Sequence, residues 1–195
     1  MTMRALSLRK LIAAAALLLF AGSIQPSVAA SPLDEIFGEP PIIKAVRESS
    51  VKDLNAALIA GDSVHKRAAD GTPLIVLATA ARSLDIVKVL IENGARPNDK
   101  SRDETTALTL AAANGDYTIA LYLLDHKADV DLPGALRETA LIKAARNDHA
   151  DIVALLIERG ADLDATDSSG ATALDIANAN NKTAVAGLLT KASKK

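Results

Sequence analysis

Residues 71–98 read GTPLIVLATAARSLDIVKVLIENGARPN, two apolar segments separated by a short polar one. Pro73 to Ala81 is predicted to form a short helix, because a proline in the first turn gives up no intrahelical hydrogen bond. A second helix is predicted over apolar positions that recur at helical spacing: Leu84, Ile86, Val87, Leu90 and Ile91. Asn93-Gly94 ends this helix, because glycine readily adopts the left-handed backbone that terminates helices. The stretch therefore predicts a helical hairpin followed by a polar connection.

The same pattern recurs with a period of 33 residues. Alanine occupies one column in five copies: Ala45, Ala78, Ala111, Ala144 and Ala177. Aliphatic side chains occupy another: Ile42, Ile75, Leu108, Leu141 and Leu174. A third column holds Gly61, Gly94 and Gly160, with Lys127 as its exception. Because one hairpin cannot bury its apolar stripe alone, neighbouring copies are expected to stack. The predicted fold class is all-α, a solenoid of five stacked helix-turn-helix units with loop or β-hairpin connections.

Three of the copies carry recognisable motifs. The last reads DSSGATALDIA over residues 167–177, the fourth has LLIERGADLD at 155–164, and the third has TAL at 106–108 and ADVD at 128–131. Together with the period, these motifs resemble ankyrin repeats, whose pattern runs D-x-x-G-x-T-P-L-H-x-A-A and ends L-L-x-x-G-A-D-V-N. The resemblance covers residues 35 to about 190. It implies a non-enzymatic module that binds partner proteins.

The sequence departs from the ankyrin pattern in three ways. The motif Gly71-Thr72-Pro73-Leu74 sits one residue too early, so Ile75 is predicted to fill the Leu column of its copy. The family's histidine is replaced in copies two to five, by Val76, Thr109, Ile142 and Asp175, which predicts looser turns. Both ends of the stack are predicted to be polar caps, on the basis of Asp34, Glu35, Asp53, Thr190, Lys191, Lys194 and Lys195.

The first 30 residues stand outside the repeat frame. Three basic residues precede an apolar run, residues 11–22, and small residues follow before Ser31. This pattern is typical of a signal peptide cleaved after Ala29 or Ala30, and the run is too short to span a bilayer of ~30 Å. We expect a periplasmic protein, with secretion as the alternative. The predicted organisation is a signal peptide (1–30), a lead-in (31–40), repeats at about 35–67, 68–100, 101–133, 134–166 and 167–190, and a basic tail (191–195).

Charge and composition exclude several classes of protein. Residues 1–30 hold three basic and no acidic side chains, so the mature chain would carry 19 basic against 24 acidic ones, a formal charge of −5. An acidic chain with 2% aromatic residues is a poor nucleic-acid binder, since phosphate contacts need clustered Lys and Arg. Nor is stable membrane insertion expected after cleavage. With no cysteine, no disulfide framework can form.

No catalytic or metal site is predicted. His65, His126 and His149 lie in three different copies, and no cysteine completes a zinc spacing. Paired acids recur at Asp129/Asp131 and Asp162/Asp164, where turn hydrogen bonding is the expected role and calcium binding the alternative. No cofactor is expected. The competing functional hypothesis is a hydrolase or metal-binding protein that uses these acidic loops and His149.

The preferred hypothesis places a partner protein on the concave surface formed by loop tips and first helices, as the resemblance implies. In the third and fourth copies these positions are Arg102, Asp103, Thr105, Asn114, Leu136, Glu138, Arg146 and Asn147. Leu136 is unusual because it is apolar at a tip expected to be exposed; it is either an anchor for the partner or part of a tip that leans on Pro133 or its neighbour. An inhibitor or immunity-type partner of an exported enzyme, or a helper in oxidative-stress defence, stays open as a more specific role.

Overall fold

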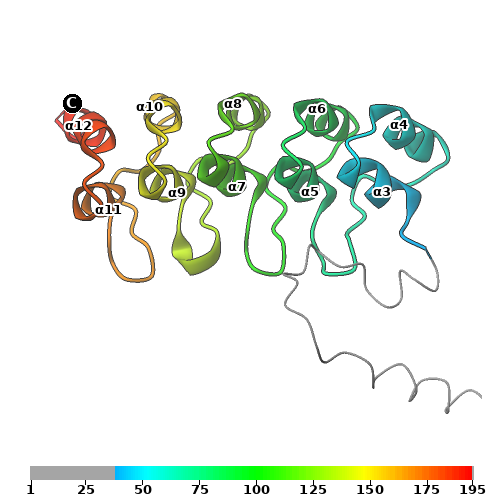
Figure 1. Cartoon of the computed structure of the whole chain (residues 1–195), viewed down its shortest axis with the longest axis horizontal. Coiled ribbons are helices and arrows are strands. Elements are labelled where there is room, and N and C mark those ends of the chain that lie inside the picture. The colour runs from blue at the N-terminus through cyan, green and yellow to red at the C-terminus, as the bar shows by residue number, and fades with distance from the viewer. Residues whose placement is uncertain (1–37, 195) are drawn as a thin grey trace, which may run out of the picture.

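The structure, a computed structural model, describes residues 38–194, in which ten α-helices form five consecutive pairs (Figure 1). The first helices of the pairs are α3 (Pro41–Arg47), α5 (Leu74–Ala80), α7 (Ala107–Asn114), α9 (Ala140–Arg146) and α11 (Ala173–Ala179). The second helices are α4 (Val51–Ile59), α6 (Leu84–Glu92), α8 (Tyr117–Asp125), α10 (Ala150–Glu158) and α12 (Thr183–Ala192). A short 3-10 helix, η1 (Ala135–Arg137), precedes α9. The predicted all-α repeat solenoid is confirmed.

The pairs stack side by side in two rows (Figure 1). Each first helix packs against the first helix of the next pair, and each second helix against the next second helix. Long loops leave the row of first helices on the side away from the second helices (Figure 1). This arrangement gives the molecule one edge made of loops and first helices and an opposite edge made of second helices.

The first helices begin at one column of the repeat frame. Pro40, Pro73, Thr106, Thr139 and Thr172 are the N-caps. Each of the three threonines accepts a hydrogen bond from the amide three residues on, which satisfies a free donor of the first turn. Pro73 is thus an N-cap, one position before the first turn in which it was predicted. Ile75 fills the Leu column, as predicted, and is buried.

Left-handed residues end the helices in two columns. After the second helices, Gly61, Gly94, Lys127 and Gly160 have φ of 98°, 91°, 68° and 80°. The exception in the glycine column, Lys127, therefore adopts the glycine conformation. After the first helices, the left-handed column holds Ser49, Arg82, Gly115, Asp148 and Asn181. In four of these five turns a residue with a Cβ takes a backbone conformation that glycine adopts more easily.

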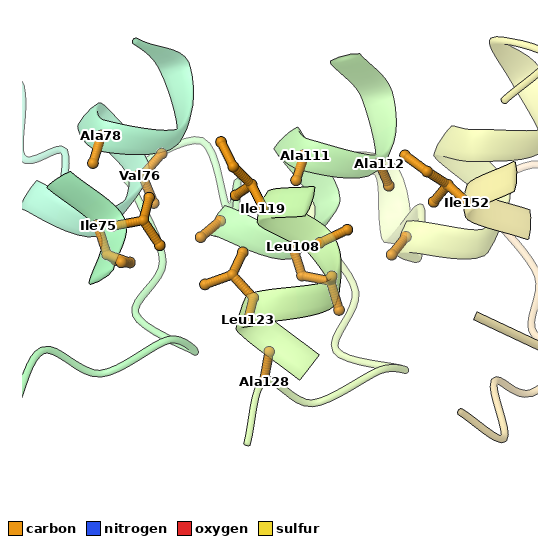
Figure 2. Close-up of a cluster of buried hydrophobic side chains, with 14 of the residues drawn as sticks. Ile75, Val76, Ala78, Leu108, Ala111, Ala112, Ile119, Leu123, Ala128 and Ile152 are labelled. Atoms are coloured by element: carbon orange, nitrogen blue, oxygen red, sulfur yellow. The ribbon is translucent and has the colours of Figure 1, made fainter. Parts of the chain in front are cut away.

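The core is continuous along the stack and consists of small aliphatic side chains. The alanine column and the buried positions of the second helices, such as Ile86, Ile119 and Ile152, have almost no exposed surface. Figure 2 shows Ile75 and Leu108 from first helices on either side of Ile119 and Leu123 from α8. Because alanine lets neighbouring helices approach closely, a larger side chain in its column would overpack the core.

The ends of the stack only partly match the predicted polar caps. Asp53, Thr190, Lys191 and Lys194 are exposed, as predicted. The first pair nevertheless also exposes Ile59, 88% of whose surface is accessible. The signal peptide, Asp34, Glu35 and Lys195 lie outside the described residues.

Candidate protein-binding surface

Four loops of the same design precede the first helices of pairs two to five. We call them finger 2 (68–72), finger 3 (101–105), finger 4 (134–138) and finger 5 (167–171). In each finger the N–H of the first residue donates to the carbonyl of the fifth, with N···O distances of 2.9, 3.0, 2.9 and 3.0 Å. The fourth residue is left-handed in each: Gly71, Glu104, Arg137 and Gly170. Isolated β-bridges flank fingers 2 and 5.

Finger 5 follows the ankyrin pattern, with Asp167 first and Gly170 fourth. The buried Asp167 carboxylate accepts hydrogen bonds from the amides of Ser169 and Ala171, at 2.8 and 3.1 Å, and from the Ser169 hydroxyl at 2.6 Å. The Ser169 hydroxyl, these amides and the Arg146 guanidinium lower the pKa of Asp167. The loop is therefore held by one ionised carboxylate, and glycine supplies the left-handed turn.

Finger 4 makes the same turn with neither residue, since Gly134 stands in the Asp column and Arg137 in the Gly column. Leu136 and Arg137 are both left-handed, with φ of 56° and 59°, and the Glu138 amide closes the turn on the Ala135 carbonyl at 3.1 Å. Two successive left-handed residues define a type I′ turn, which favours Asn and Gly. As a result the Leu136 side chain projects from the tip with 69% of its surface exposed.

A group of ion pairs anchors finger 4 to helix α9 and to finger 5. Glu138, only 3% exposed, pairs with Lys143 and with Arg146, the latter at 2.6 Å between Oε1 and Nη2. Arg146 also reaches Asp167 of finger 5, with 3.2 Å between Nη2 and Oδ2. The Leu136 carbonyl accepts a hydrogen bond from the Ser168 amide at 2.8 Å. These contacts therefore hold the base of finger 4 in place, while the Leu136 side chain at its tip stays exposed.

Fingers 2 and 3 are also joined to each other. Arg67, just before finger 2, donates from Nη1 to the Lys100 carbonyl at 2.7 Å. The Arg102 side chain lies over Gly71, where a Cβ would approach Arg102 Nε to 2.7 Å. Asp103 accepts from the Ser101 hydroxyl and from the Thr105 amide, which lower its pKa. These contacts hold the tip of finger 3 in place and leave Arg102 and Asp103 exposed.

The C-terminal ends of the first helices α7 and α9 are cross-linked by side chains. Asn147 Nδ2 donates to the Ala113 carbonyl at 2.8 Å, and His149 Nε2 lies 3.1 Å from the same oxygen. The His149 ring also packs on Gly115, where a Cβ would lie 2.7 Å from the ring carbon Cε1. His149 is thus part of the packing between pairs three and four.

At the junctions on either side of this contact, ion pairs join the column of Gly115 to the column of His149. Arg82 Nε lies 2.7 Å from Asp116 Oδ1, which links pairs two and three. Asp148 and Lys182 approach to 3.7 Å and link pairs four and five with the charges reversed. Each junction between neighbouring helix pairs, from pair two to pair five, thus has its own side-chain contact.

The acidic loops use their oxygen atoms for backbone hydrogen bonds, as predicted for turns. Asp129 and Asp162 each accept from the amide two residues on, at 3.1 and 2.9 Å. Asp131 accepts from the Asp162 amide of the next copy at 2.8 Å. Within residues 38–194, no group of three or more His, Cys, Asp or Glu side chains could hold a metal ion. In the same range no helix is long and apolar enough to cross a membrane.

The eight residues predicted from the sequence lie on one edge of the molecule, but their side chains differ in exposure and in the contacts they make. Leu136, Arg102 and Asp103 are exposed at finger tips, and Thr105 is half-buried in finger 3. Asn114 is half-buried at the end of α7, where its carbonyl accepts from Arg82 at 3.4 Å. Arg146 and Asn147 are exposed, although both make the contacts described above. The expectation that Glu138 offers its side chain at the surface is wrong, because Lys143 and Arg146 draw it into the base of the finger.

The sequence reasoning missed Lys143, Asp167 and the left-handed Arg137. The ankyrin pattern carries the signal for all three, because finger 5 keeps its Asp and Gly, whereas finger 4 lacks both and adds a glutamate with basic residues in the following helix.

Comparison with known protein families agrees with this geometry. A family model described as ankyrin repeats (3 copies) matches residues 42–134, and one described as ankyrin repeats (many copies) matches residues 133–177. None of the curated proteins matches the chain.

Proposed function

This chain belongs to the ankyrin repeat family, a generally non-enzymatic interaction fold, and we propose that it binds a partner protein in the periplasm through fingers 3 to 5 and the ends of α7 and α9. Stacked repeats present such surfaces as rigid arrays of loops and helices. The fingers of this protein are bonded to their neighbours, so little conformational entropy is lost when a partner binds them.

The observation that carries the proposal is the exposed Leu136 at the tip of finger 4. Its left-handed backbone costs about 1 kcal/mol relative to glycine, and the next residue carries a similar cost. Strained residues of this kind persist where the surroundings hold them, and they cluster at binding sites. An apolar side chain held out by such a turn is suited to serve as an anchor in a partner's pocket.

The test uses Leu136→Asn, because asparagine tolerates the left-handed backbone and the fold should be preserved. The mature protein and the variant, each immobilised, are used to capture proteins from a periplasmic extract, and the partner is identified by mass spectrometry. Binding to that partner should weaken at least tenfold, equivalent to ~1.4 kcal/mol. Ile59→Asn is the matched control, since Ile59 is an exposed aliphatic residue at the end of α4. Equal capture by both variants would move the binding site away from finger 4.

Arg146 is unsuited to the same test. Its guanidinium is shared by Glu138 and Asp167, so a change of this residue disturbs fingers 4 and 5 together. Loss of binding in an Arg146 variant would not distinguish a lost partner contact from a displaced finger.

Export is the second part of the proposal and rests on the leader sequence. We propose that residues 1–30 direct the chain to the periplasm and are then removed, so that the mature chain begins at Ala30 or Ser31. Intact-mass measurement of the protein recovered from the periplasm tests this, and a mature protein that retained residues 1–25 would contradict it.

We propose no catalytic role for His149, because its ring packs on Gly115 and its Nε2 atom lies at hydrogen-bond distance from the Ala113 carbonyl. The captured partner also decides among the more specific roles. An exported enzyme that loses activity when bound supports an inhibitor. A partner that is protected during oxidative stress supports a helper in defence.

A further inference from the structure

The chain contains two Asn-Gly dipeptides, and each of them ends a helix. Asn93-Gly94 follows α6 in the row of second helices, and Asn114-Gly115 closes α7 in the row of first helices (Figure 1). Both glycines are left-handed, with φ of 91° at Gly94 and 76° at Gly115. The two sites are therefore alike in sequence and in their turn, and they differ in their surroundings.

An Asn-Gly dipeptide can react with itself, because glycine has no Cβ to hinder the approach of its nitrogen to the asparagine side chain. The glycine amide nitrogen loses its proton to solvent hydroxide and forms a bond to the side-chain carbonyl carbon Cγ. The bond between Cγ and the side-chain nitrogen then breaks, ammonia leaves, and a five-membered succinimide remains. Water opens this ring at either carbonyl, which gives aspartate or isoaspartate. The net reaction consumes one water molecule and releases one ammonia molecule.

The helical backbone at Asn93 holds the reacting atoms apart. Asn93 has φ of −91° and ψ of 13°. This ψ turns the Gly94 nitrogen toward the nitrogen of Asn93 and away from its Cβ, whereas ring closure needs that nitrogen on the side of Cβ. The turn at the end of the helix therefore has to open before the ring can close. The free energy of this opening, which varies along a structure, decides how fast each dipeptide reacts.

The turn at Gly94 is open to solvent and is held by its own helix. Asn93 and Gly94 are both exposed, and a Cβ built on Gly94 would meet no atom within 4 Å. Asn93 Nδ2 donates to the Val89 carbonyl at 2.8 Å, and the Gly94 N–H donates to the Ile91 carbonyl at 2.9 Å. Since both acceptors belong to α6, fraying of its last turn releases the reacting atoms without moving another helix pair.

The turn at Gly115 is covered from both neighbouring helix pairs. The His149 ring of pair four packs on this glycine, where a Cβ would lie 2.7 Å from the ring carbon Cε1. Arg82 of pair two donates from Nη2 to the Asn114 carbonyl at 3.4 Å and from Nε to the buried Asp116 carboxylate at 2.7 Å. Asn114 and Gly115 are themselves half-buried. This turn can open only when contacts to pairs two and four are broken.

From this difference we infer that Asn93 is a site of spontaneous deamidation in the folded protein, and that packing between helix pairs protects the same dipeptide at Asn114. The inference does not depend on a partner protein. It assigns a covalent modification to the edge of the molecule opposite the fingers, at the end of α6.

Deamidation changes the end of α6 in two ways. The new carboxylate stands where the helix dipole disfavours negative charge, and it cannot donate the hydrogen bond that Asn93 Nδ2 gives to the Val89 carbonyl. Isoaspartate also lengthens the main chain by one carbon. This shifts the buried Ala95, whose amide donates to the Leu90 carbonyl at 2.9 Å. The deamidated protein should therefore unfold at a lower urea concentration than the intact protein.

Peptide mapping of the mature protein by mass spectrometry tests the inference. The folded protein is incubated in mildly alkaline buffer made with heavy-oxygen water, so that each deamidated residue gains a labelled oxygen. Asn93 should deamidate at least tenfold faster than Asn114. In the urea-unfolded chain the two rates should be similar, because the two dipeptides are identical.

Two variants separate the surroundings from the sequence. Gly94→Lys introduces the residue that the same column holds at Lys127, where φ is 68°, so the turn can accept it. Its Cβ hinders the attacking nitrogen, and deamidation of Asn93 should slow at least tenfold. His149→Ala uncovers Gly115 and should raise the rate at Asn114 several-fold, while the rate at Asn93 stays unchanged.

The other outcomes contradict the inference in distinguishable ways. Equal rates at Asn93 and Asn114 in the folded protein would show that packing gives no protection. Deamidation in urea alone would show that the end of α6 stays closed, and would overturn Asn93 as a modification site. An unchanged rate at Asn114 in His149→Ala would overturn the protective role of the ring. A rise at both sites in that variant would mean that it unfolds, and the comparison within the wild-type protein then decides.

Discussion

Fingers 4 and 5 make the same loop from different residues. Both close a hydrogen bond between their first and fifth residues, and both need a left-handed fourth residue. Finger 5 uses Asp167 and Gly170, so its own carboxylate and a permissive glycine stabilise the turn. Finger 4 has Gly134 and Arg137 instead, and takes its stability from the ion pairs of its last residue, Glu138, with Lys143 and Arg146 of α9.

The two fingers differ in which interactions stabilise the loop. In finger 5 the turn is locally satisfied, and its tip residues are a serine pair without strain. In finger 4 the turn is locally unfavourable and depends on ion pairs with α9, which leaves Leu136 exposed at the tip. The residues of finger 4 are not those that its turn prefers, and such conflicts in natural proteins tend to mark functional positions.

Arg146→Ala should have the largest effect on this comparison. It removes the guanidinium that Glu138 and Asp167 share, and both carboxylates are nearly buried. Because Lys143 still pairs with Glu138, we expect a loss of about 2 kcal/mol in unfolding free energy, below the full cost of a broken buried pair. Urea denaturation measures this loss.

Lys88→Ala is the control for that variant, because its 4.0 Å pair with Asp85 is exposed and should contribute well under about 1 kcal/mol. Equal effects of the two changes would show that finger 4 does not depend on its ion pairs.

A reciprocal exchange of the fourth finger residue should come next in size. Arg137→Gly removes the backbone strain of a left-handed residue and should raise the unfolding free energy by about 1 kcal/mol. Gly170→Arg introduces the same strain into finger 5 and should lower it by a similar amount. Thermal unfolding of the two variants and of the double exchange tests this. Changes of the same sign in both fingers would mean that backbone strain is not the deciding difference.

Lys127→Gly extends the comparison to a left-handed residue outside the fingers. Lys127 has φ of 68° at the end of α8, in the column that otherwise holds glycine. We expect a gain of about 0.5–1 kcal/mol, because glycine relieves the left-handed strain but also gives the unfolded chain more freedom. A clear loss of stability in urea would show that α8 ends in another way in solution.

The smallest expected effect is the pH dependence of the stability that Asp167 gives to finger 5. The folded-state pKa of Asp167 is lowered, chiefly by the Ser169 hydroxyl, so its contribution to stability is present above the unfolded value of about 3.9 and lost as pH falls through the folded value. Asp167→Asn should therefore differ most from wild type at neutral pH and converge with it below about pH 4. Urea unfolding at several pH values between neutrality and about pH 2.5 measures the convergence, and a constant difference would contradict it.

Much of the candidate surface followed from the sequence, because the tip of each finger keeps its place in the frame. Leu136 was predicted to be exposed, and its exposure is confirmed. The burial of Glu138 could not be predicted from its place near the tip, since it depends on Lys143 and Arg146 reaching back from the following helix. The link between Arg146 and Asp167 spans 21 residues, beyond the reach of any helical periodicity.

By itself, the sequence determined the repeat, the five helix pairs, the alanine column and the left-handed position that Lys127 occupies. These features are local or periodic, so hydrophobic spacing and turn residues express them directly. The tertiary structure alone decided which charges pair across fingers, that the His149 ring packs on Gly115, and that the base of finger 4 is tied to finger 5. Side chains from different repeats choose their partners only when stacking has brought them together, and the length of a side chain and its burial then decide which contact forms.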